Sequence, residues 1–122
     1  MNILANILMI EDNTFIGRVI QMVLEEVGHK VEWCKSGTEA FDVLDSKQPD
    51  LVMTDLGLPG KSGKEVLEKM RSEQHLVGVP AIIMTGSFPD SKDYPEKNFY
   101  QGILEKPFDL EELKTTIKQW VS

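Results

Sequence analysis

Short apolar runs alternate along this chain with longer segments in which apolar residues recur every three or four positions. The runs are too short to be helices, and they lack the polar alternation of a half-exposed strand. They therefore indicate strands that are covered on both faces. Five such strands are predicted, at residues 7–10, 31–34, 51–54, 81–84 and 103–104.

The segment after the first run has the periodicity of an amphipathic helix. From Thr14 onward, apolar residues stand at positions 15, 16, 19, 20, 23, 24 and 27, which fall on one helical face. Gly28 stands where a helix stop is expected. We predict a helix that begins near Thr14, ends before Gly28 and has one apolar face.

Three further helices are predicted from their start signals. Ser36 with Glu39, and Ser62 with Glu65, have the spacing of a capping box, in which a serine and a glutamate satisfy each other's backbone N–H groups. The last helix begins near Asp109 and has apolar residues at positions 110, 113, 117 and 120.

Strands that alternate with helices predict a doubly wound parallel sheet. Right-handed crossovers with helices on both faces favour a flavodoxin-like strand order of 2-1-3-4-5. At 122 residues the chain is expected to form one domain, residues 1–122, with a core that needs no disulfide.

The segment between the fourth and fifth strands departs from this regularity. Residues 86–102 should contain the fourth helix, but they include Pro89 and Pro95. A proline inside a helix costs about 3 kcal/mol or more. We expect a short, broken or mobile fourth helix here.

Composition excludes several classes of partner. The formal net charge is −7, from 13 Lys plus Arg against 20 Asp plus Glu, and this argues against direct contact with nucleic acid or an anionic membrane. No apolar run approaches the roughly 18 residues that span a membrane, and the N-terminus lacks a signal-peptide pattern. We expect a cytoplasmic protein.

Single polar residues outside the motifs carry little functional signal. Cys34 lies in the apolar stretch VEWC and has no second cysteine with which to pair, so burial is expected. His29 and His75 have no second metal-type ligand nearby in the sequence, and both are expected at the surface.

Reactive side chains stand at the ends of four predicted strands. The first strand leads to Glu11 and Asp12, the third to Asp55, the fourth to Thr85 and the fifth to Lys106. The carboxyl ends of parallel strands share one edge of the sheet, where ligands bind in such folds. Three carboxylates at one edge repel each other unless a cation neutralises them. The sequence therefore predicts a Mg²⁺ site at this edge.

Each acidic residue has a distinct expected role. Asp12 and Asp55 can bind Mg²⁺ directly, and the longer side chain of Glu11 can hold a metal-bound water. The backbone carbonyl of Gly57 is a further candidate ligand. The same edge also has the ammonium of Lys106 and the hydroxyl of Thr85. Carboxylates, a metal site and these two donors are the groups that phosphoryl transfer to a carboxylate requires.

Taken singly, these residues have ordinary structural explanations. The acidic pair could cap the following helix, Asp55 could stabilise a turn, and Lys106 could be a surface lysine. Their occurrence together, each at the end of one strand, favours a functional site.

These pieces give the chain a resemblance to a known family. Glu11-Asp12, Asp55 within DLVMTDLGLPGKSG, Thr85-Gly86 and Lys106-Pro107-Phe108 resemble the motifs of receiver domains of two-component response regulators, over residues 7–121.

The resemblance implies a phosphorelay signalling function. It implies that Asp55 accepts a phosphoryl group from a phosphohistidine on a sensor histidine kinase or a histidine phosphotransfer protein. It also implies that Glu11 and Asp12 organise Mg²⁺, that Lys106 contacts the phosphoryl group and that Thr85 moves to hydrogen-bond it. The Lys106–Pro107 bond is cis in the family.

One departure from the family concerns the output of the switch. Three residues before Lys106 the family often has a Tyr or Phe that turns inward on activation, and this chain has Ile103. We therefore expect activation to order or shift residues 86–102 rather than to flip an aromatic ring.

Other functions remain as alternatives. A phosphatase of the haloacid dehalogenase type also uses a strand-end Asp nucleophile, but it has a second Asp two residues later, where this chain has Gly57. An interaction module that works without phosphorylation would not need the acidic pair, and Ile103 favours it. A nucleotide-binding domain would need a glycine-rich loop, and the first turn reads EDNTFIG.

The sequence thus predicts a phosphoacceptor domain that modifies only itself, rather than an enzyme with an external product. The chain ends at Ser122, soon after the last helix. We expect output through a downstream effector or a second copy of this chain, at a surface within residues 86–122, unless a longer protein was trimmed.

Overall fold

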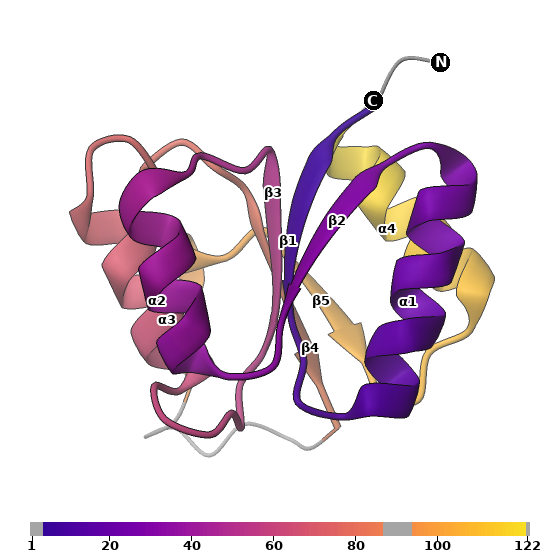
Figure 1. Cartoon of the computed structure of the whole chain (residues 1–122), viewed down its shortest axis with the longest axis horizontal. Helices are drawn as coiled ribbons and strands as arrows, with labels where there is room; N and C mark the ends of the chain where they lie inside the picture. Colours follow the sequence, from indigo (N-terminus) through magenta and orange to yellow (C-terminus); the bar gives the residue numbers. More distant parts are fainter. Residues whose placement is uncertain (1–3, 87–93, 122) are drawn as a thin grey trace.

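The computed structural model describes residues 4–86 and 94–121, which form a five-stranded parallel sheet in the order β2-β1-β3-β4-β5 (Figure 1). This confirms the predicted fold class and strand order. The strands are β1 (Asn6–Ile10), β2 (Lys30–Cys34), β3 (Leu51–Asp55), β4 (Ala81–Thr85) and β5 (Gly102–Glu105). The α-helices within the described ranges are α1 (Thr14–Val27), α2 (Gly37–Ser46), α3 (Gly63–Ser72) and α4 (Leu110–Trp120).

The helices cover both faces of the sheet. Figure 1 shows α1 and α4 on one face and α2 and α3 on the other. Successive residues of β1 point to opposite faces, so Ile7 and Met9 join the core under α1 and α4, while Leu8 and Ile10 join the core under α2 and α3. A strand that is buried on both faces has no polar position, which explains the continuous apolar runs in the sequence.

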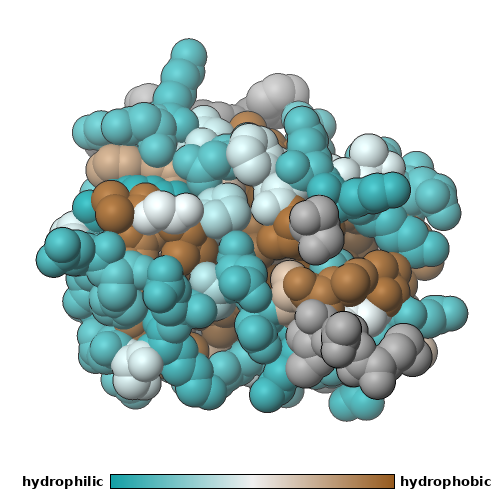
Figure 2. Space-filling view, turned by 90° about the horizontal axis from the view of Figure 1, so that it is seen from above, coloured by the Kyte–Doolittle hydropathy of each residue, from teal (hydrophilic) through white to brown (hydrophobic). Residues whose placement is uncertain are grey.

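The strand register places the functional ends side by side. Ile10 pairs with Thr54 across β1 and β3, and Thr85 pairs with Glu105 across β4 and β5. The residues that follow these pairs leave the sheet at the same edge. Figure 2 views the other edge, at the amino ends of the strands, where the surface is mainly hydrophilic with separate apolar patches.

Helix α1 buries only part of its apolar face. Ile20 and Leu24 are fully buried, but the Phe15 side chain is 78% exposed and Val27 is also exposed. Asn13 caps the start of the helix by accepting from the N–H of Ile16. The periodicity predicted the helix correctly, but it did not show that Phe15 and Val27 on its apolar face would be exposed.

The predicted helix signals are confirmed with one refinement. Ser62 and Glu65 make both bonds of a capping box at the start of α3. At the start of α2, Ser36 accepts from the N–H of Glu39, which is one of the two bonds. Gly28 ends α1 at φ 117°, a left-handed conformation that favours glycine.

The connection between β4 and β5 is irregular in its described part. Residues 94–101 contain a short 3-10 helix, Lys97–Phe99, and no α-helix. Pro95 is buried. Residues 87–93, which include Pro89, lie outside the described residues, and so the prediction of a short or broken fourth helix is tested only over the second half of the segment.

Arg71 of α3 holds the end of this connection. Its Nε and Nη2 atoms donate to the carbonyl oxygen of Phe99 at 3.1 and 2.9 Å. Its Nη1 atom donates to the carbonyl oxygen of Val79 at 2.9 Å, and burial lowers the pKa of this arginine. The segment that leads into β5 is therefore tied to α3 and to the loop before β4.

The prediction that His29 lies at the surface is wrong. The side chain is only 7% exposed, and its Nδ1 atom has no hydrogen-bond partner within the described ranges. His29 lies between Gly28 and the first residue of β2, Lys30, and its imidazole is buried there. Cys34 is buried as predicted, and this burial raises the pKa of its thiol to about 11.

The burial of His29 should make stability depend on pH. Burial lowers the pKa of His29 in the folded protein, whereas the unfolded chain titrates near 6.5. The unfolded state therefore binds more protons as the pH falls below about 6.5, and the stabilisation present above this pH is lost. Urea unfolding at pH 7.5 and 5.5 should show a larger loss for the wild-type protein than for His29→Leu. Equal losses in the two proteins would contradict this assignment.

Candidate functional site

The loop between β1 and α1 presents two acidic residues in different environments. Glu11 is fully buried, whereas Asp12 is exposed. The backbone N–H of Glu11 donates to Cys34 O at 3.0 Å, and Trp33 Nε1 donates to Glu11 O at 2.8 Å. The N–H of Asn13 donates to Glu11 Oε2 at 3.1 Å. Backbone and side-chain bonds therefore fix this loop from both sides.

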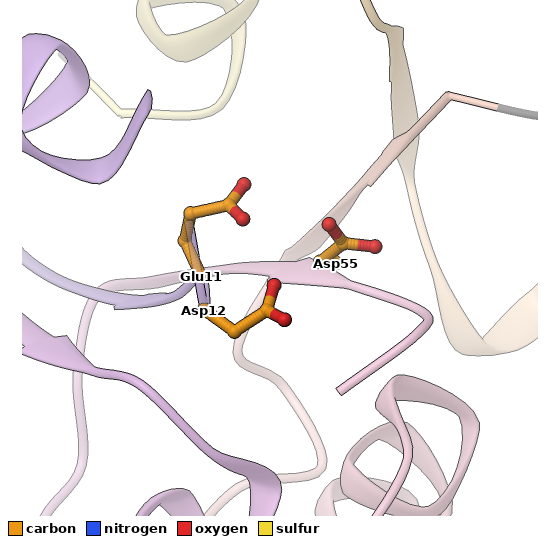
Figure 3. Close-up of side chains that lie close together, drawn as sticks. All are labelled: Glu11, Asp12 and Asp55. Atoms are coloured by element: carbon orange, nitrogen blue, oxygen red, sulfur yellow. The ribbon is translucent and has the colours of Figure 1, made fainter. Parts of the chain in front are cut away.

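Three carboxylates gather where β1 and β3 end. Glu11, Asp12 and Asp55 each offer an oxygen, and these oxygens all lie within 4.8 Å of one another (Figure 3). Carboxylate oxygens are the ligands that Mg²⁺ prefers, and Mg²⁺ is usually bound by one or two of them together with waters. The donor set therefore fits a divalent cation of this kind.

Lys106 forms ion pairs with both Glu11, which is buried, and Asp55, which is half-buried. Its Nζ atom lies 2.5 Å from Glu11 Oε1 and 2.6 Å from Asp55 Oδ2. Burial raises the pKa of Glu11, and its bond to Lys106 offsets this in part. Burial opposes the charge on Lys106, but the bonds to Asp55 and Glu11 outweigh it and raise the pKa of the ammonium. The lysine therefore stays charged within the cluster.

Asp55 is the half-buried member of the cluster. Its Oδ1 atom accepts from the N–H of Gly57 at 3.2 Å, and its Oδ2 atom contacts Lys106. A Cβ atom at Gly63 would lie 2.1 Å from Asp55 O, so the start of α3 approaches the Asp55 backbone more closely than any other residue would allow. The structure shows the amide of Gly57 in contact with Asp55, and its carbonyl as a metal ligand stays a prediction.

Thr85 completes the row of strand ends. It is largely buried at the end of β4, and its carbonyl oxygen accepts from the N–H of Lys106 at 2.7 Å. The structure thus brings Glu11, Asp12, Asp55 and Lys106 into one cluster. Thr85 is linked to that cluster through the backbone of Lys106.

Comparison with protein families shows to which family this chain belongs. The model of the response regulator receiver domain matches residues 7–118. The chain belongs to this family. The receiver resemblance inferred from the sequence motifs is therefore confirmed, and the family is a signalling family rather than a family of metabolic enzymes.

Curated relatives of this chain include proteins of similar length and longer proteins. The chain is 31% identical to the probable methanogenesis regulatory protein FilR2 of Methanothrix harundinacea, over 93% of this chain and 79% of that protein. It is 29% identical to sporulation initiation phosphotransferase F of Bacillus subtilis, over 94% and 92% of the two chains. Against the probable transcriptional regulator ycf29 of Porphyra purpurea, at 34% identity, 95% of this chain spans only 56% of the relative. The chain thus spans about half the length of some of its relatives.

A solved receiver structure shares the fold of this chain. The receiver domain of the sensor histidine kinase PA1611 from Pseudomonas aeruginosa PAO1 superimposes with a TM-score of 0.87 at 25% identity, over 95% of this chain and 96% of that one. In that structure a magnesium ion is coordinated in the active-site cleft.

Two features noted from the motifs are present in the receiver. The Lys106–Pro107 bond is cis, as the resemblance implied. Ile103 lies on β5, where its side chain is 44% exposed, so no aromatic ring stands at this position.

Sequence reasoning missed the residues that hold the acidic loop. Trp33 lies in the predicted second strand, and its indole N–H donates to the backbone carbonyl of Glu11. Asn13 has the residue type and position of a helix cap, and this signal could have been found. The bond of Trp33 joins residues 22 positions apart, and no local pattern predicts it.

The close approach at Gly63 gives a prediction with a matched control. Gly63→Ala should push the start of α3 away from Asp55, with a cost of about 1–3 kcal/mol in the free energy of unfolding and weaker Mg²⁺ binding. A Cβ atom at Gly57 would meet nothing within 4 Å, so Gly57→Ala should change stability by less than about 0.5 kcal/mol. Urea unfolding and calorimetric Mg²⁺ titration measure both effects. Equal behaviour of the two variants would contradict the packing argument.

Proposed function

We propose that residues 1–122 form a receiver domain in which Asp55 is the phosphoacceptor of a phosphorelay and Mg²⁺ is the cofactor. The observation that carries the proposal is the place of Asp55 at the end of β3, in one cluster with Glu11 and Asp12 and in contact with the ammonium of Lys106. Both carboxylate oxygens of Glu11 already accept bonds, from Lys106 and from the N–H of Asn13. The Asp55 side chain is 18% exposed and contacts the ammonium of Lys106.

The transfer step uses the side chains at the strand ends. A carboxylate oxygen of Asp55 attacks the phosphorus of a phosphohistidine, the P–N bond breaks, and the imidazole leaves with the electron pair of that bond. Lys106, already 2.6 Å from Asp55 Oδ2, donates to a phosphoryl oxygen and stabilises its charge. Thr85 supplies a hydroxyl from the adjacent strand and is the residue proposed to move when the phosphoryl group is present.

The same cluster supports a set of metal ligands. We assign Asp12 and Asp55 as direct ligands, Glu11 as the holder of a metal-bound water and the Gly57 carbonyl as a further ligand. When bound, Mg²⁺ neutralises charge on the acidic cluster and on the transferred phosphoryl group. The magnesium ion described for the Pseudomonas aeruginosa receiver supports this choice of metal.

A groove beside the site supports a phosphohistidine-bearing protein as the donor. It has a volume of about 320 Å³ and lies between α1 and the loop that follows β5. Phe15, at its rim, is the most exposed large apolar side chain in the described part of the chain. We propose that a sensor histidine kinase or a histidine phosphotransfer protein covers this groove while its phosphohistidine reaches Asp55. The groove is lined by Phe15, Ile16, Val19, Ile20, Lys106, Pro107, Phe108 and Leu110.

We place the output of the switch on β5 and the end of α4. Ile103 on β5 and Trp120 at the end of α4 are exposed apolar residues within the predicted surface of residues 86–122. A downstream effector or a second copy of the chain would bind there. None of the helices in residues 4–86 and 94–121 has the length and hydrophobicity of a membrane span.

A phosphatase that releases phosphate from small esters is disfavoured by the loop after Asp55. The residue two positions later is Gly57, which has no side chain to act as a general acid. We propose that the domain catalyses only its own phosphorylation and dephosphorylation.

Phosphorylation should occur at Asp55 alone. Incubation with acetyl phosphate and Mg²⁺ should add the mass of one phosphoryl group in intact-mass analysis, and Asp55→Asn should abolish the addition. Asp42→Asn, which changes an exposed aspartate on α2, should leave it intact. An adduct that persists in Asp55→Asn would show that the acceptor is another residue.

The two acids of the β1–α1 loop should contribute differently to metal binding. Asp12→Ala removes a direct ligand and should weaken Mg²⁺ binding by about tenfold or more. Glu11→Gln should weaken it less, because Glu11 is already bonded to Lys106 and Asn13. Asp12→Ala should also raise the stability of the metal-free protein, since like charges no longer crowd one edge. Unchanged Mg²⁺ affinity in Asp12→Ala, measured by calorimetry, would place the metal elsewhere.

A further inference from the structure

Trp33 lies on β2 and is not a candidate metal ligand, yet it reaches the metal-site loop. Its indole packs against the core under α1 and α4 while remaining partly exposed. Its Nε1 atom donates to Glu11 O at 2.8 Å, and Lys35 Nζ lies 5.0 Å from the ring centroid. The indole therefore bridges β2 and the loop that carries the acidic pair.

The first helix is shaped to receive this indole. Gly17 is buried within α1, where glycine is an unfavourable helix residue. A Cβ atom at Gly17 would lie 2.1 Å from Cζ2, 2.5 Å from Cε2 and 2.8 Å from Cη2 of Trp33. The six-membered ring of the indole thus lies directly against the helix backbone, and any larger residue at position 17 would displace it.

The bond from Trp33 acts on the peptide that joins the two acids. Glu11 O belongs to the peptide group between Glu11 and Asp12, so the indole N–H fixes the orientation of this group. The N–H of Glu11 is held on its other side by Cys34 O at 3.0 Å. Since the Asp12 side chain begins immediately after the fixed peptide, its direction toward Asp55 depends on this bond.

We infer that Trp33 is a positioning residue for the divalent-metal site, and that Gly17 provides the space that lets its indole reach Glu11. The inference rests on the proposed function, because it requires Mg²⁺ to bind at Glu11, Asp12 and Asp55. It assigns a role in metal affinity to two residues that contact no metal ligand atom.

Calorimetric Mg²⁺ titration of Trp33→Phe tests the role directly. Phenylalanine keeps a ring but lacks the N–H donor, and Mg²⁺ affinity should fall about tenfold, as for other losses of groups that orient metal ligands. Trp120→Phe changes the only other tryptophan and should keep the wild-type affinity. Wild-type affinity in Trp33→Phe would overturn the inference while leaving the proposed metal site intact. Absence of Mg²⁺ binding by the wild-type protein would overturn both.

Gly17→Ala provides a second route that leaves the indole chemically unchanged. The added methyl group should displace the ring, break the bond to Glu11 and weaken Mg²⁺ binding by a similar factor. In the double variant Gly17→Ala/Trp33→Phe the two losses should not add, because both act through the same bond. A purely structural role would lower the unfolding midpoint in urea without changing Mg²⁺ affinity, and that result would contradict the inference.

Tryptophan emission gives an independent readout. In the Trp120→Phe variant Trp33 is the only tryptophan, and its emission should change saturably as Mg²⁺ is added. The change should follow the calorimetric affinity and should disappear when Asp12→Ala is added. An emission that does not respond at saturating Mg²⁺ would show that the indole is not coupled to the site.

Discussion

The ammonium group of Lys106, between Glu11 and Asp55, is the interaction on which the rest of the site depends. Glu11 is fully buried and Asp55 half-buried, so neither carboxylate has enough water to stabilise its charge alone. Removing one partner of a buried ion pair typically costs about 3–5 kcal/mol, because the other charge is left uncompensated. The lysine thus allows two acids to stand close together before any metal or phosphoryl group arrives.

The sheet brings these three residues together from distant parts of the sequence. Glu11 follows β1, Asp55 ends β3 and Lys106 follows β5, and the parallel order places all three strand ends at one edge. The apolar strands hold this edge in place because they are packed on both faces. Glycine at position 63 then lets α3 approach Asp55, while Gly17 lets Trp33 lie against α1. The site is therefore positioned by backbone packing as much as by its own side chains.

The sequence predicted the strands, their order and the cluster because these follow from local patterns and one topological rule. Apolar runs locate the strands, and parallel strands share an edge, so the cluster of Glu11, Asp12, Asp55 and Lys106 could be predicted without a structure. Periodicity shows which face of a helix is apolar, but it does not show how far the sheet extends beneath it. The exposure of Phe15 therefore could not be predicted.

Contacts between residues that are far apart in the sequence could not be predicted from it either. The bond of Trp33 to Glu11 and the burial of His29 depend on how α1 and the strand β2 pack in space. In the sequence, Trp33 lies in a short predicted strand and His29 follows a predicted turn, and neither position indicates these contacts. The role of Thr85 in binding follows from the resemblance to receivers, and the Gly57 carbonyl is a candidate from the number of oxygen ligands that Mg²⁺ takes; both stay predictions.

A double-mutant cycle on Lys106 and Glu11 tests the central claim most directly. The free energy of unfolding would be measured by urea denaturation without Mg²⁺ for the wild-type protein, Lys106→Met, Glu11→Gln and the double variant. The account predicts that Lys106→Met alone costs about 3–5 kcal/mol and that the double variant costs clearly less than the sum of the two single changes. Additive costs, or a Lys106→Met variant as stable as the wild-type protein, would contradict it.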